Sequence, residues 1–312
     1  MDKIIIKQYD GQERDACIRL LRQTFPGSSD ESTFKWRFEL NAGRKPLIIC
    51  AMKGGTVVSF NSWIPWEFSF RNDRVVGFQS GESATDVRYR GKGFFAEILR
   101  AGCSAASDLG ADFLFGFPSH ISFGAFYKTG YHPVNTYFSY LRPINPLKTK
   151  PSESILVQPD SLFDSPLTQY DRITPVFDAN YYKWRYTNNP KNYETIVFSR
   201  DNNTIAFFFR KKKWKNLTEF LLMDVQLNTY NPVFIQTSIN LLDRFLTRKA
   251  FCVRTFFNEF SHRARALIKY FPIRFKSKYH VLVVKPISTR LSANVVLDCN
   301  CWDIMPHCVD YL

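Results

Sequence analysis

Residues 78–95 read FQSGESATDVRYRGKGFF, and the organisation of the first half of the chain follows from this stretch. Its pattern predicts a strand up to about Val87, and apolar residues spaced by three and four predict an amphipathic helix from about Gly93 to Gly110. A glycine-containing turn at the start of a helix leaves several backbone amides pointing at one place, where the helix dipole adds positive potential. Gly91 and Gly93 also let a diphosphate approach the backbone. The stretch therefore predicts an anion-binding turn.

Two common nucleotide-binding motifs do not account for this turn. The P-loop pattern GxxxxGK[ST] is absent from the sequence, and so is the dinucleotide pattern GxGxxG. The 312-residue chain has a net charge of +14, of which residues 1–145 contribute +4 and the remainder +10. A basic chain favours a polyanionic partner, such as a phosphorylated cofactor, a nucleotide-linked substrate, nucleic acid or an anionic surface.

An internal repeat divides the chain. Residues 34–38 read FKWRF, and residues 182–186, 148 positions later, read YKWRY. The same offset aligns two predicted strands and the turn between them, which contains Gly54-Gly55 in the first copy and Asn202-Asn203 in the second. We therefore predict two tandem α/β units of one design.

The two units are predicted to occupy residues 1–145 and 172–312, joined by a connector at 146–171 that is rich in Pro and Ser. No stretch approaches the ~18 apolar residues of a membrane span, and the N-terminus lacks the apolar region of a signal peptide. We therefore expect a cytoplasmic protein without a membrane span.

The seven cysteines are an odd number and mostly lie singly within apolar segments, which is ordinary thiol usage in a reducing compartment. The exception is the tail, which contains Cys299, Cys301, His307 and Cys308. Because the CxC spacing lacks the CxxC geometry of common zinc sites, we predict no metal site.

The turn resembles the cofactor loop of the GNAT N-acetyltransferases. Residues 90–95, RGKGFF, are similar to the family's [Q/R]xxGx[G/A] loop, which binds the pyrophosphate of acetyl-CoA between the fourth strand and the third helix. Phe95 stands where the pattern has Gly or Ala, and because its amide remains, the anion site is expected to survive. Further along, residues 122–131, SFGAFYKTGY, resemble the family's second signature, "A..FY.k.GY/F".

The resemblance covers residues 1–145 and implies the GNAT fold. This fold is α/β (or α+β), with a mixed, mostly antiparallel twisted sheet that is flanked by helices and splayed at strands four and five. The resemblance also implies which residues bind acetyl-CoA. They are Ala84, Thr85, Asp86, Val87, Arg88, Arg90, Gly91, Lys92, Gly93, Phe94, Phe95, Phe123, Phe126 and Lys128.

Acetyl transfer to an amine needs a deprotonated amine, a polarised thioester carbonyl and a proton for the leaving thiolate. The resemblance implies that Tyr127 protonates the thiolate and that a backbone amide within residues 84–87 polarises the carbonyl. The alternative for Tyr127 is a core ring whose hydroxyl is satisfied by the protein.

Glu82 lies on the predicted fourth strand, where many GNAT enzymes carry a general base, and strict alternation places it on one face with Ser80 and Ala84. Its alternative is a salt-bridged or solvent-facing carboxylate. His120 is a further candidate, because imidazole suits proton transfer near neutral pH. Since the pair Ser119-His120 recurs as Ser261-His262, a repeated structural role is its alternative.

The second unit lacks the anion-binding turn. Residues 227–232 read LNTYNP, with no glycine and no arginine, and Pro232 suits the first position of a plainly capped helix. We therefore expect one acetyl-CoA site, in the first unit, and a degenerate second copy. The basic segments 210–215 and 263–278 read as solvated faces or as contacts for an anionic acceptor.

The sequence thus predicts an acetyl-CoA-dependent N-acetyltransferase that acts on a primary amine of a small molecule or sugar. Its pattern also resembles acetyltransferases of bacterial cell-surface polysaccharide synthesis, which favours a nucleotide-linked amino sugar as acceptor. No DNA partner is expected. Two alternatives stay open: a Fem-like aminoacyl-tRNA-dependent transferase, and a non-catalytic CoA-sensing or partner-binding module.

Overall fold

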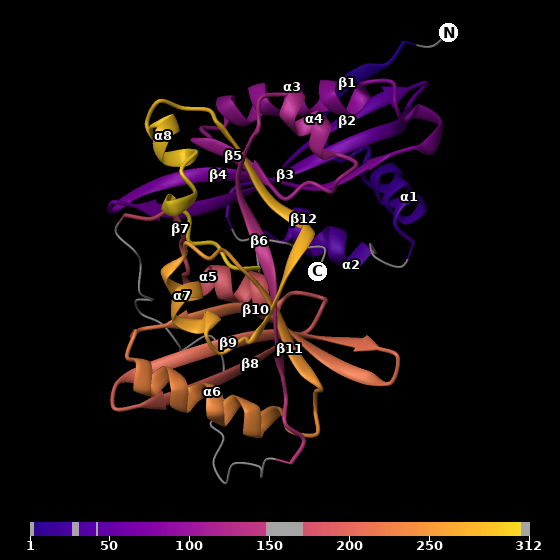
Figure 1. Ribbon diagram of the computed structural model, residues 1–312. Helices are drawn as coiled ribbons and strands as arrows, with labels where there is room; N and C mark the ends of the chain where they lie inside the picture. The colour runs from indigo at the N-terminus through magenta and orange to yellow at the C-terminus, as the bar shows by residue number, and fades with distance from the viewer. Residues whose placement is uncertain (1–2, 27–30, 42, 148–170, 307–312) are drawn as a thin grey trace. The chain divides into compact units, whose positions relative to one another are not determined.

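A computed structural model describes the protein at residues 3–26, 31–41, 43–147 and 171–306. The chain forms two compact units, each built on a twisted sheet with helices on its faces (Figure 1). Unit 1 comprises Met1–Phe68, Asp73–Asn135 and Tyr279–Asp298, and unit 2 comprises Ser69–Asn72, Thr136–Lys278 and Cys299–Leu312. The predicted fold class, a mixed and mostly antiparallel sheet flanked by helices, is confirmed.

Unit 1 contains a sheet of order β1-β2-β3-β4-β5-β12, in which β4 and β5 pair in parallel. Its elements are β1 (Ile5–Gln8), α1 (Arg14–Thr24), α2 (Glu31–Phe34), the π-helix η1 (Lys35–Glu39), β2 (Leu47–Lys53), β3 (Thr56–Phe70), β4 (Asp73–Thr85), the 3₁₀-helix η2 (Val87–Tyr89), α3 (Phe94–Asp108), β5 (Phe113–Gly116), α4 (Phe123–Lys128), the end of β12 (Ile273–Pro286) and α8 (Ala293–Val296).

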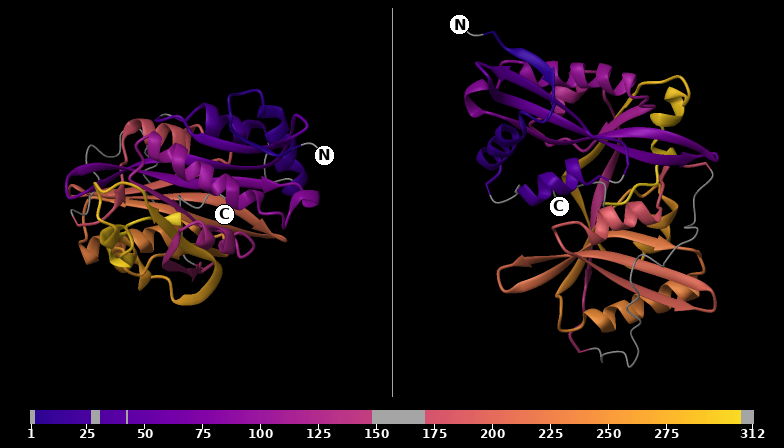
Figure 2. Two further views of the ribbon diagram at one scale, coloured as in Figure 1. Left: turned by 90° about the horizontal axis from the view of Figure 1, so that it is seen from above. Right: turned by 180° about the vertical axis from the view of Figure 1, so that it is seen from behind.

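Helices cover both faces of this sheet (Figure 2). On one face α3 packs against β2 and α4, and its apolar residues, spaced by three and four, join a core with Trp63 and Phe78. On the other face α1 packs against β4, and its buried residues join Phe34, Phe60 and Ala84 in a second core. The sheet is therefore buried on both sides.

The approach of α3 to the sheet depends on one glycine. Gly102 lies in the middle of α3 and is buried, and a Cβ atom added to it would lie 2.1 Å from Cη2 of Trp63. The Trp63 ring is fully buried, and its Nε1 donates a hydrogen bond to the hydroxyl of Tyr131 at 3.3 Å. Because no side chain fits between helix and ring, Gly102 sets how closely α3 lies on the sheet.

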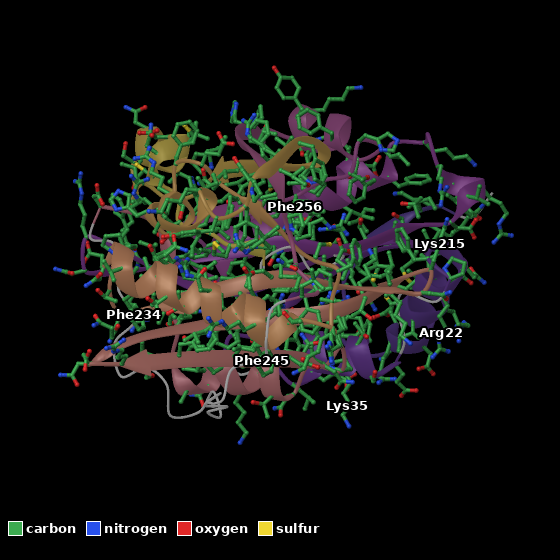
Figure 3. All side chains as sticks on the ribbon, turned by 60° about the horizontal axis from the view of Figure 1, so that its bottom comes forward. Arg22, Lys35, Lys215, Phe234, Phe245 and Phe256 are labelled. Carbon is green, nitrogen blue, oxygen red and sulfur yellow. The ribbon has the colours of Figure 1, made fainter. Side chains whose placement is uncertain are left out.

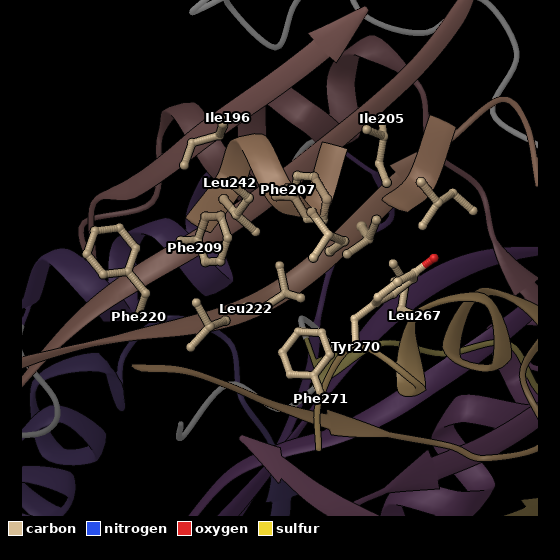
Figure 4. Close-up of a cluster of buried hydrophobic side chains, with 14 of the residues drawn as sticks. Ile196, Ile205, Phe207, Phe209, Phe220, Leu222, Leu242, Leu267, Tyr270 and Phe271 are labelled. Carbon is tan, nitrogen blue, oxygen red and sulfur yellow. The ribbon is translucent and has the colours of Figure 1, made fainter. Parts of the chain in front are cut away.

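Unit 2 contains a sheet of order β6-β11-β10-β9-β8, in which β10 and β11 pair in parallel. Its elements are β6 (His132–Pro143), β7 (Thr174–Pro175), α5 (Ala179–Tyr182), the π-helix η4 (Lys183–Thr187), β8 (Tyr193–Arg200), β9 (Asn203–Trp214), β10 (Leu217–Leu227), α6 (Pro232–Leu246), β11 (Cys252–Phe257), α7 (His262–Ile268), the start of β12 and the 3₁₀-helix η5 (Cys299–Cys301). Phe207 and Phe209 of β9 pack with Phe220 and Leu242 in its largest core (Figure 4).

Both units run through the same series of local structures. Each KWR motif forms a π-helix, η1 in unit 1 and η4 in unit 2, and in each the Trp and Arg side chains are buried. The lysine of the first motif, Lys35, is exposed and points away from the ribbon (Figure 3). The hairpin turns after β2 and β8 both have positive φ values, at Gly54-Gly55 and at Asp201-Asn202. The second turn therefore lies one residue earlier than the offset of 148 predicts, because Asn203 is the first residue of β9 and not part of the turn.

The units depart from the sequential boundaries expected at residues 145 and 172. β6 pairs with β11 in unit 2, whereas the end of β12 pairs with β5 in unit 1. Each sheet thus includes a strand from the other half of the sequence. The sequence pattern could not show this exchange. The short strands β5 and β11 are similar, and each takes an antiparallel partner, so the pattern does not reveal which of β6 and β12 pairs with which. Most of the expected connector, residues 148–170, lies outside the described residues.

The packing at Gly102 leads to a prediction about stability. A Gly102→Ala substitution should destabilise the protein by about 1–3 kcal/mol, because overpacking against Trp63 outweighs the better helix propensity of alanine. Gly124→Ala is the matched control: Gly124 also lies in a helix, α4, but has open space around its added Cβ. Urea denaturation should show a lower midpoint for Gly102→Ala and an equal or higher one for Gly124→Ala. Equal midpoints for the two variants would contradict the close approach of α3.

Candidate active site

The predicted anion-binding turn lies between β4 and α3. Gly91 and Gly93 have φ values of +74° and +87°, and a Cβ atom added to either would meet nothing within 4 Å. Gly93 is the N-cap of α3 and has no side chain to cap the helix. Amides of the first helical turn have no intrahelical acceptor, so the amides that follow Gly93 point outward from the start of a 15-residue helix. The geometry suits a phosphate group next to the backbone.

The two parallel strands beside the turn pair over a short distance only. Their register runs from Gly77↔Phe113 to Ser80↔Gly116, where β5 ends, whereas β4 continues to Thr85. This leaves the last part of β4 extending beyond the end of β5, as the expected splay requires. Just after β4, the amide of Asp86 donates to the carbonyl oxygen of Val58 in β3 at 2.9 Å.

Alternation along β4 is interrupted, which corrects one expectation. Phe78 belongs to the core on the α3 face, whereas Ala84 belongs to the core on the α1 face. Strict alternation would place these two residues, and Ser80 and Glu82 between them, on one face. Ser80 contacts the Asn61 side chain, while Glu82 pairs with Arg37 of η1. The alternation therefore changes phase within β4, a feature that period-two reasoning cannot detect.

The cations of the turn are not equivalent. Arg88 makes a bidentate ion pair with Asp86, with Nη2 to Oδ2 at 2.6 Å and Nε to Oδ1 at 3.1 Å. The side-chain hydrogen bond from Arg88 is the main reason that the pKa of Asp86 falls to about 2. Arg90 donates from Nε to the carbonyl oxygen of Thr85 at 3.1 Å, which ties the turn back to β4. Arg88 is thus already neutralised by the protein.

The second signature forms α4 and divides into an exposed and a buried part. Tyr127 is 62% exposed, so the structure does not place it in the core. Lys128 is also exposed and Phe123 is half-buried. Phe126 is buried, and its ring contacts the rings of Phe95 and Tyr131 at 5.9 and 4.9 Å. Phe126 therefore supports the packing of α4.

Phe95 has a clear structural role. It follows the first residue of α3 and packs edge-to-face on Phe126, which joins the start of α3 to α4. A glycine or alanine at this position would leave the Phe126 ring without that contact. The departure of Phe95 from the family pattern is thus compensated by aromatic packing behind the turn.

Glu82 forms an ion pair with the buried Arg37. The Arg37 side chain is 2% exposed and that of Glu82 is 15% exposed, so both charges are largely removed from water. Sequence reasoning did not connect these two residues, because they are 45 positions apart and lie on different elements. The available signal was the repeat itself, because Glu82 and Asp224 each lie three residues before the end of their strands. Asp224, however, pairs with Arg263, which lies outside the KWR motifs.

His120 is exposed in the turn that leads to α4, next to Ser119, whose hydroxyl contacts that of Ser122 at 3.1 Å. In unit 2 the corresponding Ser261 is fully buried, caps α7 and donates to Asp303. The two Ser-His pairs therefore have different structural surroundings, and a shared structural role for His120 is not supported.

Unit 2 replaces the turn and the site with structural contacts. The side chain of Asn231 caps α6 by accepting hydrogen bonds from the amides of Val233 and Phe234, at 2.9 and 3.2 Å. A phosphate would have to displace this cap. The amides at the start of α6 are thus satisfied by the chain itself.

The carboxylate that corresponds to Glu82 is enclosed in a buried network. Asp224 accepts from Tyr186 at 2.9 Å and pairs with Arg263, whose Nε lies 2.9 Å from Oδ2 of Asp303. Burial alone would lower the pKa of Arg263, but the carboxylates of Asp303 and Asp224 raise it, so the guanidinium stays charged. Unit 1 has the exposed Ile121 where unit 2 has Arg263, directly after the Ser-His pair.

Among the described residues, no group of three or more His, Cys, Asp and Glu side chains is arranged to hold a metal ion. Cys299 and Cys301 lie in η5, and His307 and Cys308 lie outside the described residues. None of the described helices combines the length and hydropathy that a membrane span requires.

The part of the chain that contains this site is similar to a known protein family. Residues 6–134 match the family model described as "Acetyltransferase (GNAT) domain". The match runs from β1 to the start of β6 and includes the turn, α3 and α4. These residues are therefore similar to a GNAT acetyltransferase domain. A search of curated proteins finds no match to the chain.

Solved structures extend the likeness in fold to nearly the whole chain. A probable N-acyltransferase from Enterococcus faecalis has a TM-score of 0.67 at 10% identity, covering 92% of this chain and 73% of its own. A GCN5-related N-acetyltransferase from Anabaena variabilis has a TM-score of 0.64 at 10% identity, with the same coverage. The N-myristoyltransferase of Saccharomyces cerevisiae, solved with myristoyl-CoA, has a TM-score of 0.59 at 11% identity, covering 94% and 86%.

The ion pair between Arg37 and Glu82 leads to a second prediction. Arg37→Met should cost about 3–5 kcal/mol of stability, because it leaves a largely buried carboxylate without its partner. The double variant Arg37→Met, Glu82→Gln should recover a large part of that loss, because no charge is left unpaired. A double-mutant cycle on the urea midpoints measures this coupling. Additive effects of the two single substitutions would show that the pair does not act as a unit.

Proposed function

We propose that the protein is an acetyl-CoA-dependent N-acetyltransferase with one active site, formed by residues of unit 1. The observation that carries the proposal is the turn at Gly91 and Gly93: two positive-φ glycines with open space, followed directly by the N-terminus of a long helix. This arrangement fits a diphosphate held by backbone amides. The match of residues 6–134 to the family model of an acetyltransferase domain favours acetyl-CoA as the donor.

The donor supplies an acyl group activated as a thioester, and the chain supplies the groups around it. The amine nitrogen forms a bond to the carbonyl carbon while the bond from carbon to sulfur breaks. A backbone amide in the last part of β4 polarises the carbonyl oxygen, and the Tyr127 hydroxyl gives its proton to the sulfur. The 62% exposure of Tyr127 supports this role, because its hydroxyl is not enclosed by the core.

Removal of the amine proton is assigned to Glu82, with His120 as the second candidate. Glu82 lies on β4, and its ion pair with Arg37 fixes the orientation of the carboxylate. His120 is exposed in the turn after β5. Because β4 and β5 are parallel neighbours, the ends of both strands reach the same edge of the sheet.

Unit 2 serves as a second, degenerate copy in this proposal. The repeated π-helices, the repeated hairpin and the repeated parallel strand pair support a tandem origin. The Asn231 cap and the buried Asp224–Arg263–Asp303 network argue against a second donor site. We assign to unit 2 a supporting role.

The acceptor class is a primary amine on a small molecule or sugar. The net charge of +14 favours an acceptor that carries phosphate, and a nucleotide-linked amino sugar is therefore the first substrate to screen. A salt-dependent electrophoretic shift with tRNA would instead favour an aminoacyl-tRNA-dependent transferase. Absence of acetylation across a broad amine panel, with acetyl-CoA still bound, would favour a CoA-sensing module.

Calorimetry with acetyl-CoA tests the donor site. The variants Gly91→Glu and Gly93→Glu should lose at least about tenfold in affinity, because a side chain and a negative charge occupy the space of the diphosphate. Gly110→Glu is the matched control: Gly110 follows the other end of α3, has a φ of +78° and meets nothing within 4 Å. Equal affinity in all three variants and the wild type would remove the donor site from this turn.

Kinetics of a Tyr127→Phe variant test the proposed acid. Loss of the hydroxyl should lower kcat about 10²-fold and leave KM for acetyl-CoA nearly unchanged, because the group acts on the leaving sulfur. Folding should not be affected, since the side chain is largely exposed. An unchanged kcat would show that Tyr127 is not the acid.

A further inference from the structure

Three cations surround the ring of Tyr89, the last residue of η2. The Nζ of Lys92 lies 5.0 Å from the ring centroid, the Nζ of Lys53 lies 5.5 Å from it, and the Cζ of Arg88 lies 5.9 Å from it. Lys53 is the last residue of β2, whereas Lys92 lies between the two glycines of the turn. Two elements that are separate in sequence therefore bring basic groups to one aromatic ring.

Only one of these cations is neutralised by the protein. Arg88 makes its bidentate ion pair with Asp86. Within residues 3–26, 31–41, 43–147 and 171–306, no carboxylate lies within ion-pair distance of Lys53 or Lys92. An anion close to Lys53 and Lys92 would therefore be attracted by two ammonium charges that no carboxylate of these residues offsets.

The position of Lys53 is set by the hairpin that follows it. Gly54 and Gly55 have φ values of +52° and +76°, and Lys53 pairs across the turn with Thr56. In unit 2 the same place, before the turn, is held by Arg200, which pairs with Asp201 at 3.3 Å. Unit 1 has glycine in place of that aspartate. The uncompensated cation is thus a property of the unit that carries the anion-binding turn.

Both lysines lie near the ring of Tyr89. The negative face of a tyrosine ring attracts an ammonium group electrostatically. Tyr89 is itself held by contact with Phe94, the first residue of α3, with centroids 6.4 Å apart. The lysines are therefore gathered beside the start of α3 before any ligand binds.

We propose that Lys53, Lys92 and Tyr89 form a site for the 3′-phosphate on the ribose of CoA. The proposal rests on the proposed function, because it requires that the diphosphate of the donor lies on the turn at Gly91 and Gly93. Lys92 lies between these glycines, so the two phosphate sites adjoin along the chain. The backbone amides serve the diphosphate, and the two ammonium groups serve a phosphomonoester, which carries about −1.5 to −2 charge at pH 7.

The site makes the 3′-phosphate a specificity determinant. CoA and 3′-dephospho-CoA share the diphosphate, the pantetheine arm and the thiol, and they differ in this one group. The wild type should therefore bind CoA about tenfold or more tightly than 3′-dephospho-CoA, as expected for charge-assisted hydrogen bonds to one phosphate.

Calorimetry with both ligands on matched variants tests this assignment. Lys53→Met and Lys92→Met should each weaken CoA binding by about fivefold to tenfold and change 3′-dephospho-CoA binding by less than about twofold. The control is Arg22→Met, which removes an exposed cation from the last turn of α1 and should weaken neither ligand. All three side chains are outside the buried cores, so the variants should fold.

The outcomes separate this inference from the function on which it rests. Equal losses for both ligands, or a wild type that binds both equally, would overturn the 3′-phosphate site while leaving the donor site intact. A wild type that binds neither ligand would overturn both. Loss of CoA affinity in Arg22→Met as well would show a general charge effect and also overturn the specific site.

Discussion

The close packing of α3 on the sheet of unit 1 is the constraint on which the candidate site depends. Gly102 lets the helix lie directly on the Trp63 ring, and the hydrogen bond from Trp63 to Tyr131 joins this contact to the segment after α4. With α3 held in this way, its first turn and the glycines before it have a fixed direction. The ring contact between Phe95 and Phe126 supports the same end of the helix. An anion site made of backbone amides needs such a rigid support, because it has no side chain that could adjust to a ligand.

The two units share a series of local structures but differ at the start of the long helix. In unit 1 the start of α3 is preceded by glycine, the turn carries cations without carboxylate partners, and the exposed Ile121 follows the Ser-His pair. In unit 2 an asparagine caps the helix, and Arg263 fills the interior by pairing with Asp224 and Asp303. The backbone arrangement is retained, whereas the groups that could meet a ligand have been turned toward the protein. The position before the helix is therefore a glycine that leaves the first amides open in unit 1 and an asparagine that caps them in unit 2.

Much of the fold could be predicted from the sequence, and the site only in part. The strands and helices follow from hydrophobic spacing, and the turn at Gly91 and Gly93 follows from residue type, because these signals are local. The exchange of β6 and β12 between the sheets, the phase change within β4 and the pair formed by Arg37 and Glu82 depend on contacts distant in sequence. The repeated KWR motif indicated two equivalent helices, but it did not show that their arginines are buried. Of the side chains predicted on α4, Phe126 is buried and Tyr127 and Lys128 are exposed, a division that residue types alone did not give.

The central claim is that one chain has one donor site, formed by the start of α3. Native mass spectrometry of the full chain with increasing acetyl-CoA measures this directly, because each bound molecule adds a defined mass. We expect a single bound acetyl-CoA per chain at saturation, and the Gly93→Glu variant should need at least about tenfold more acetyl-CoA to reach it. Two bound molecules per chain would contradict a single donor site, and saturation of the variant at the wild-type concentration would contradict the placement of the site.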